Sequence, residues 1–247
     1  MKRRIRFKKN SGCGIYVLLV VIFTAAMLVF LRSDFFSIKS IEVEGNSYVS
    51  EETILACSDI KIGQNIFDFK AKDIQNSLKS IARIKNVSIV RAYPDTVKII
   101  ITERNPMMYI YNEGKYYTLD DEGIVFEADC TNIASGAIMV SGFSDITIPE
   151  VGRAFDFSLT AQTQTVYEVI DFFKRNNLIE YVSEIYISQS GYYYIYTTKS
   201  NVIKFYSLAS FQSNEDMIKY FLTNEEGNIM LEVIEDSNPV YKIIDIN

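Results

Sequence analysis

The chain has 247 residues, of which 48% are hydrophobic and 23% charged, and it contains no histidine. The lack of histidine excludes catalytic triads with a histidine base and histidine-based metal sites. The net charge is −6 and the first nine residues carry +6, so the remainder carries −12, which argues against binding a phosphate backbone.

The first predicted element is a membrane anchor. Residues 2–9 include six Lys and Arg residues, whereas residues 10–31 carry no charge. Ile15–Leu31 alone would form a helix of roughly 26 Å, close to the thickness of a bilayer core. The basic cluster predicts a cytoplasmic N-terminus. A cleaved signal peptide is the alternative, but no small-residue cleavage pattern follows Leu31.

A strand, two helices and a hairpin are predicted next. The segment IEVEG, from Ile41, alternates apolar and acidic residues, which is typical of a half-buried strand. Ser50 is a good N-cap for the first helix, and the second has an apolar stripe within Phe67–Ile81. Two alternating strands then flank a turn at Pro94–Asp95. The predicted order is strand, helix, helix, strand, strand.

Several motifs in residues 35–127 carry a family resemblance. They are FSIKSIEVEGN from Phe36, G-x-N-x-F from Gly63 to Phe67, YPDTVKI from Tyr93, Glu103-Arg104 with Pro106, and GKYYTLDDEGIVFE from Gly114. The first four are similar to a POTRA domain, and their setting resembles the FtsQ/DivIB family of bacterial cell-division proteins. The last is similar to the segment with which that family begins its second, β-rich domain. Over residues 128–247 the resemblance is mostly architectural.

The remaining residues predict a second domain of mixed composition. Strand patterns cover Ile138–Phe143, 182–188, 192–198 and 201–206, and two further strands surround residues 236–239. Helical periodicity covers Thr160–Asn177 and Asn214–Leu222. We predict a mixed α+β sheet that is mostly antiparallel, with its last strand at an edge.

The predicted fold class is therefore α+β, with a single N-terminal transmembrane helix before a POTRA domain (β-α-α-β-β) and a second mixed α+β domain. The predicted divisions are a cytoplasmic basic tail (1–12), a transmembrane signal anchor (13–32), the POTRA domain (35–104) and a β domain (105–247).

Three features invite a chemical interpretation. Residues 120–122 are acidic and could bind a cation, although L-D-D-E-G before an apolar run favours a hairpin turn. Tyrosines between Tyr192 and Tyr196 could stack on sugars, but a strand would divide them between two faces, which favours sheet packing. Cys57 and Cys130 fall in different predicted domains, which favours free thiols over a disulfide. We nominate no catalytic, cofactor-binding or metal-binding residue.

The resemblance implies a function. It implies a non-enzymatic divisome scaffold that binds the extracellular parts of small bitopic division proteins of the DivIC/FtsB and FtsL types. It would help to couple them to septal peptidoglycan synthesis. In the family, partner capture maps to the last strands of the second domain, which correspond here to Val240, Tyr241, Lys242, Ile243 and Ile244. A plain closing strand is the alternative for this segment.

The same resemblance sets the expected location and the competing function. We expect a single-pass protein of the cell membrane at the division septum, held by Ile15–Leu31, with a cytoplasmic N-terminus and extracellular C-terminal domains. A membrane-anchored cell-envelope enzyme or sensor that acts on wall sugars is the alternative.

Overall fold

The computed structural model describes residues 11–129, 137–143, 146–235 and 237–244. Contacts divide the chain into two compact units. The first contains the residues up to 80 and residues 84–103, and the second contains residues 81–83 and those from 104 onward. The predicted basic cluster at positions 2–9 and Cys130 lie outside the described residues, while Cys57 is a free thiol.

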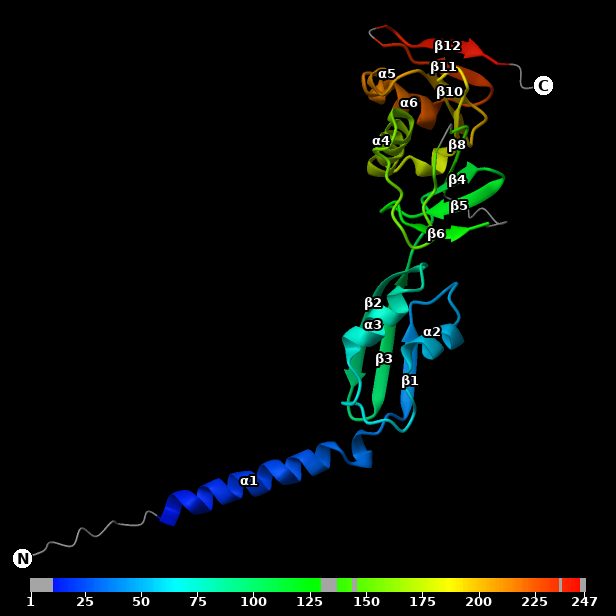
Figure 1. Cartoon of the computed structure of the whole chain (residues 1–247). Coiled ribbons are helices and arrows are strands. Elements are labelled where there is room, and N and C mark those ends of the chain that lie inside the picture. The colour runs from blue at the N-terminus through cyan, green and yellow to red at the C-terminus, as the bar shows by residue number, and fades with distance from the viewer. Residues whose placement is uncertain (1–10, 130–136, 144–145, 236, 245–247) are drawn as a thin grey trace, which may run out of the picture. The chain divides into compact units, whose positions relative to one another are not determined.

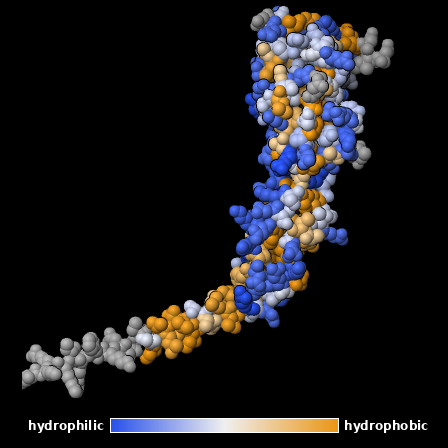
Figure 2. Space-filling model, viewed as in Figure 1, coloured by the Kyte–Doolittle hydropathy of each residue, from blue (hydrophilic) through white to orange (hydrophobic). Residues whose placement is uncertain are grey.

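The first element of unit 1 is one long apolar helix, α1 (Ser11–Leu31). Its segment Gly14–Leu31 is long and apolar enough to cross a membrane, and none of it is buried. At about 1.5 Å per residue, 18 residues cover roughly 27 Å, which matches the thickness of a bilayer core. Figure 2 shows the nearly continuous apolar surface of this helix. The predicted segment Ile15–Leu31 therefore lies in a single helix with the properties of a membrane anchor.

The rest of unit 1 is a three-stranded sheet with two helices (Figure 1). The strand order is β1-β3-β2, in which β1 is parallel and β2 antiparallel to β3. In chain order the elements are β1 (Ser40–Glu44), α2 (Glu51–Ser58), α3 (Ala71–Lys79), β2 (Ile84–Ala92) and β3 (Thr96–Glu103). The predicted β-α-α-β-β order is confirmed.

The core of unit 1 follows from alternation along β3. Val97, Ile99 and Ile101 are at most 3% exposed, whereas the residues between them are less buried. Strand geometry points alternate side chains to opposite faces, so these three share the helix-covered face. Ser50 caps α2 as predicted, since its hydroxyl accepts the Thr53 N–H at 3.3 Å.

The predicted apolar stripe from Phe67 to Ile81 is longer than the helix that carries it, because α3 covers only Ala71–Lys79. The side-chain oxygen of Asn65 accepts the Phe67 N–H at 3.0 Å. This local turn competes with the helix and delays its start. Within α3, Ile74 and Leu78 form the buried face.

Unit 2 is built on a nine-stranded sheet in the order β12-β11-β10-β9-β8-β7-β4-β5-β6. Among the described residues, five neighbouring pairs are antiparallel and three are parallel, so the predicted mixed, mostly antiparallel sheet is confirmed. The strands are β4 (Met108–Asn112), β5 (Lys115–Leu119), β6 (Val125–Ala128), β7 (Ile138–Ser141), β8 (Val182–Ile187), β9 (Tyr193–Thr197), β10 (Val202–Phe205), β11 (Ile229–Glu232) and β12 (Val240–Ile243).

Helices α4 (Ala161–Arg175), α5 (Leu208–Gln212) and α6 (Glu215–Asn224) pack on this sheet (Figure 1). Aromatic rings connect α4 and α5 to the sheet. The ring centre of Phe211 in α5 lies 5.1 Å from that of Phe205 in β10 and 5.2 Å from that of Phe172 in α4. Helices α4 and α6 correspond to predicted elements, whereas the short α5 was not predicted. It begins with a reciprocal cap between Ser207 and Ser210.

The acidic residues 120–122 form the turn of the β5–β6 hairpin, as predicted. Asp120 is fully buried and accepts the N–H groups of Glu122 at 3.0 Å and Ile124 at 2.9 Å. Its second oxygen pairs with the Arg104 guanidinium, which also donates to the Ala82 carbonyl at 3.2 Å. Burial lowers the pKa of Arg104, but hydrogen bonds to Asp120 and Glu122 outweigh this and raise it overall. Asp120 therefore stabilises the turn through these contacts and does not face solvent, where it could bind a cation.

Candidate partner-binding site

Strand β12 is an edge of the nine-stranded sheet, and within the described ranges its paired neighbour is β11. The two strands are antiparallel, with Ile243 opposite Ile229 and Val240 opposite Glu232. All four β12 residues are exposed, and Ile243 is 88% exposed. Four of the five predicted contact residues thus form the open edge, and Ile244 follows directly.

Hydrogen-bond alternation shows which main-chain groups face outward. The Ile244 N–H donates to the Asn228 carbonyl at 2.8 Å, while the Val233 N–H donates toward β10, to the Lys204 carbonyl at 2.8 Å. In an antiparallel pair, opposite residues alternate between bonded and non-bonded pairs. Lys242 therefore bonds to β11, and the N–H and C=O groups of Tyr241 and Ile243 face the open edge.

The side chains of β12 divide between two faces. The Tyr241 hydroxyl donates to the Met217 sulfur of α6 at 3.3 Å, and its ring lies 5.8 Å from that of Phe221. Lys242 lies on the other face and pairs with Glu232 of β11. Two of the five predicted partner contacts, Tyr241 and Lys242, therefore also attach β12 to its own unit.

Glu232 connects the last three strands of the sheet. Its carboxylate pairs with Lys204 of β10 at 2.8 Å and with Lys242 of β12. Hydrogen bonds from Lys204 and then from Lys242 lower the pKa of Glu232 below its ordinary value. At neutral pH the carboxylate is charged and fixes the register of β12.

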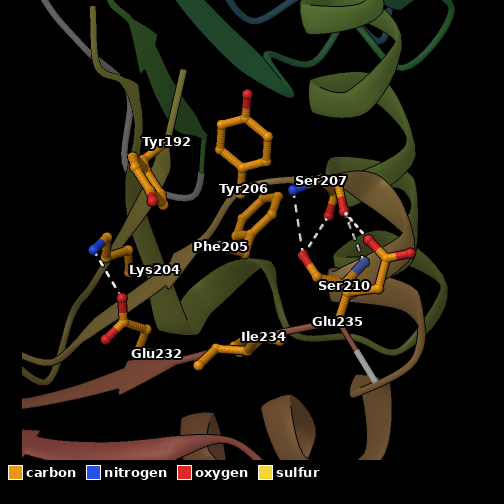
Figure 3. Close-up of a pocket in the computed structure, with 10 residues that line it drawn as sticks. Tyr192, Lys204, Phe205, Tyr206, Ser207, Ser210, Glu232, Ile234 and Glu235 are labelled. Atoms are coloured by element: carbon orange, nitrogen blue, oxygen red, sulfur yellow. Dashed lines mark hydrogen bonds and ion pairs between the residues drawn. The ribbon is translucent and has the colours of Figure 1, made fainter. Parts of the chain in front are cut away.

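A pocket of about 360 Å³ lies at the Glu232 end of the β11–β12 hairpin (Figure 3). The ammonium group of Lys204 lies 4.3 Å from the centre of the Tyr192 ring. On the other side the Ser207 hydroxyl donates to Glu235 at 3.1 Å. The pocket combines an aromatic wall with charged groups that are already paired, so it can receive an amphipathic side chain but lacks a reactive arrangement.

The tyrosines of β9 divide between two faces, as predicted. Tyr193 is 5% exposed and stacks on Phe205 in the core at 4.9 Å. Tyr194 and Tyr196 lie on the opposite face, where Tyr194 is 6.2 Å from Tyr186 of β8. Across the parts of the chain that the structure describes, no group of three acidic or cysteine side chains is placed to hold a metal ion.

Sequence reasoning missed the Glu232 ion pairs and the pocket beside them. Lys204 and Glu232 are 28 residues apart, and they meet because β10 and β11 pair in parallel across α5 and α6. No local spacing predicts that contact. The cap at Ser207 and Ser210 was the one local signal near the pocket.

Known proteins similar to this chain are cell-division proteins. The family model described as "POTRA domain, FtsQ-type" matches residues 36–104. Cell division protein DivIB of Clostridium acetobutylicum is 35% identical over 97 residues, which cover 39% of this chain and 39% of that protein. Cell division protein FtsQ of Syntrophotalea carbinolica is 34% identical over 111 residues, 45% of this chain and 38% of that protein. The matched segments span less than half of each relative.

A longer but weaker match is the cell division protein FtsQ of a Geobacter species, 23% identical over 173 residues, 69% of this chain and 61% of that protein. Among solved structures, the major extracytoplasmic domain of DivIB from Geobacillus stearothermophilus aligns with a TM-score of 0.32 and 12% identity. It covers 50% of this chain and 96% of that one.

Proposed function

We propose that this chain is a member of the FtsQ/DivIB family of bacterial cell-division proteins and acts as a non-enzymatic scaffold of the divisome, because residues 36–104 match the FtsQ-type POTRA domain and its relatives are the cell division proteins DivIB and FtsQ. It binds the extracellular parts of small bitopic division proteins of the DivIC/FtsB and FtsL types. Through them it helps to couple the division machinery to septal peptidoglycan synthesis. It acts from the cell membrane at the septum, with a cytoplasmic N-terminus and extracellular C-terminal domains.

The open edge of β12 is the observation that carries this proposal. A partner segment can join an unpaired sheet edge as an additional strand, using main-chain hydrogen bonds for affinity. Tyr241 and Ile243 supply the outward N–H and C=O groups, and Ile243 adds an apolar side chain that is 88% exposed. Edges that are not used for pairing are commonly blunted by charge, proline or a covering element. Among the described residues 237–244, only Lys242 and Pro239 have that character.

The size of the edge predicts how the partner gains affinity. Two outward-facing residues provide two donors and two acceptors, and at about 0.5–1.5 kcal/mol each these bonds contribute roughly 2–6 kcal/mol. Burial of an exposed isoleucine side chain contributes about 1.5–3 kcal/mol, so the side chain of Ile243 contributes about as much as two of these hydrogen bonds. The main chain of β12 and the side chain of Ile243 therefore act together.

The proposal is tested with proline at alternate positions of β12. Ile243→Pro removes an N–H that faces the open edge, whereas Lys242→Pro removes one that bonds to β11. Proline is tolerated on an edge strand where its missing N–H faces solvent. We expect Ile243→Pro to abolish co-purification of the full chain with DivIC/FtsB-type or FtsL-type partners without lowering the melting temperature of unit 2.

Ile243→Ala is the matched control, because it keeps the N–H and removes most of the side chain. It should weaken partner recovery without abolishing it. Lys242→Pro should lower thermal stability. Full partner recovery by a folded Ile243→Pro variant would move the interface away from β12.

The proposed location is tested with a fluorescent fusion of the full chain. The fusion should form a band at midcell, and a uniform membrane signal would contradict a role in division.

A further inference from the structure

A series of aromatic rings joins the end of α1 to the adjacent end of the unit 1 sheet. The short helix η1 (Asp34–Phe36) follows the anchor. Phe36 lies 5.4 Å from Phe30 of α1 and 5.0 Å from Phe35, measured between ring centres. On its other side Phe36 lies 5.3 Å from Phe67, which stacks at 5.6 Å on Tyr93.

Hydrogen bonds hold these rings at the level where the anchor ends. The side-chain amide of Asn65 donates to the carbonyl of Leu31, the last residue of α1, at 2.9 Å. The Ile66 N–H donates to the Phe36 carbonyl at 2.9 Å. The loop that carries Phe67 is therefore bonded both to the last residue of α1 and to the last residue of η1.

Three of these rings remain open to the surroundings. Phe35 is 55% exposed, Phe67 42% and Tyr93 59%, although each contacts another ring. Large apolar side chains gathered on one surface mark a binding surface for a protein or a membrane. We call Phe35, Phe67 and Tyr93 the aromatic girdle.

The position of the aromatic girdle decides between these occupants. A helix of roughly 27 Å that crosses a bilayer ends at the lipid headgroups, and aromatic side chains concentrate at that level. Phe35 of the girdle stacks on Phe30 in the last turn of α1, with 5.7 Å between the ring centres, so the girdle begins at that end. Charge does not favour anionic lipid, since Arg32 and Lys39 are balanced by Asp34 and Asp95.

We propose that the aromatic girdle lies in the headgroup region of the outer leaflet and forms a second membrane contact of unit 1, beyond α1 itself. This inference rests on the part of the proposed function in which α1 spans the membrane. It does not depend on β12 or on any protein partner.

The chain contains no tryptophan, so a single introduced tryptophan reports one position without background. Tyr93→Trp and Phe67→Trp place the reporter in the aromatic girdle while preserving an aromatic ring. Phe23→Trp places it inside α1. Tyr48→Trp is the matched control in unit 1. The main-chain N–H of Tyr48 donates to the carboxylate of Glu103, which ends β3, whereas Tyr93 lies just before Thr96, which begins β3. Seven strand steps place these ends roughly 23 Å apart.

Each full-length variant is reconstituted in phosphatidylcholine vesicles whose acyl chains carry bromine near the glycerol, and tryptophan quenching is measured. We expect Tyr93→Trp and Phe67→Trp to be quenched several-fold more than Tyr48→Trp, with emission shifted to the blue. Equal, weak quenching at these three positions with a quenched Phe23→Trp would overturn the girdle proposal. That result would instead favour a protein occupant. An unquenched Phe23→Trp would show that the anchor itself is not inserted.

Discussion

The most quantitative prediction concerns the buried ion pair of the β5–β6 turn. Asp120 has no exposed side-chain surface, and the Arg104 side chain is only 14% exposed. Asp120→Ala removes the charge that compensates Arg104 and leaves the N–H groups of Glu122 and Ile124 without their acceptor. Breaking a buried pair by removing one partner typically costs about 3–5 kcal/mol.

The surroundings of Arg104 favour the lower end of that range. Glu122 remains 3.1 Å from the guanidinium and the Ala82 carbonyl 3.2 Å from it, so the cation keeps two partners. We therefore expect a loss of about 3 kcal/mol in the free energy of unfolding of unit 2. At about 2–4 °C per kcal/mol for a domain of this size, the melting temperature should fall by roughly 6–12 °C.

Asp121→Ala is the matched control, because it removes the same charge from the adjacent position. Asp121 pairs with Lys174 at 3.1 Å, but both side chains are more than 40% exposed. Such a surface pair contributes about 0–1 kcal/mol. The assay is thermal unfolding of the full chain in detergent, in which the near-ultraviolet circular dichroism of the tyrosines monitors the loss of folded protein. Equal decreases in melting temperature for the two variants would refute the assignment of Asp120 as the turn anchor.

Two further predictions concern the late strands and a tight turn. The pKa of Glu232 is lowered from 4.5 by Lys204 and Lys242, so its contribution to stability is present above pH 4.5 and is lost as the pH falls through the lower folded-state value. The difference in melting temperature between the wild type and Glu232→Gln should therefore shrink as the pH is lowered below 4.5, and a constant difference would contradict the ion pairs. Gly142 has a φ of +83°, and a Cβ there would lie 2.0 Å from the Ile187 carbonyl oxygen. Gly142→Ala should destabilise unit 2 by more than about 1 kcal/mol in urea unfolding, and an unchanged midpoint would mean that the backbone relaxes freely.

Much of the fold could be predicted because its signals are local. Alternation along β3, the Ser50 cap and the turn at residues 120–122 each depend on residues within a few positions of one another, and the structure contains all three. The predicted apolar stripe begins before α3 does, because the Asn65 side chain accepts the Phe67 N–H and forms a local turn that helical periodicity does not encode.

For the candidate partner-binding site, the sequence predicts the segment Val240–Ile244 but not its surroundings. The two strands around residues 236–239 were visible as patterns, but the open edge depends on the parallel pairing of β10 with β11 across two helices. The ion pairs of Glu232 and the series of rings from Phe30 to Tyr93 likewise join residues far apart in the chain. Such contacts are set by topology and not by spacing.

Site-resolved hydrogen exchange of β12, with and without a partner's extracellular domain, tests the central claim most directly. In the free protein, the amide of Lys242 should be protected by β11, and those of Tyr241 and Ile243 should exchange rapidly. With a DivIC/FtsB-type or FtsL-type partner bound, the amides of Tyr241 and Ile243 should become protected. A bound partner that leaves both amides in rapid exchange would contradict strand addition at β12.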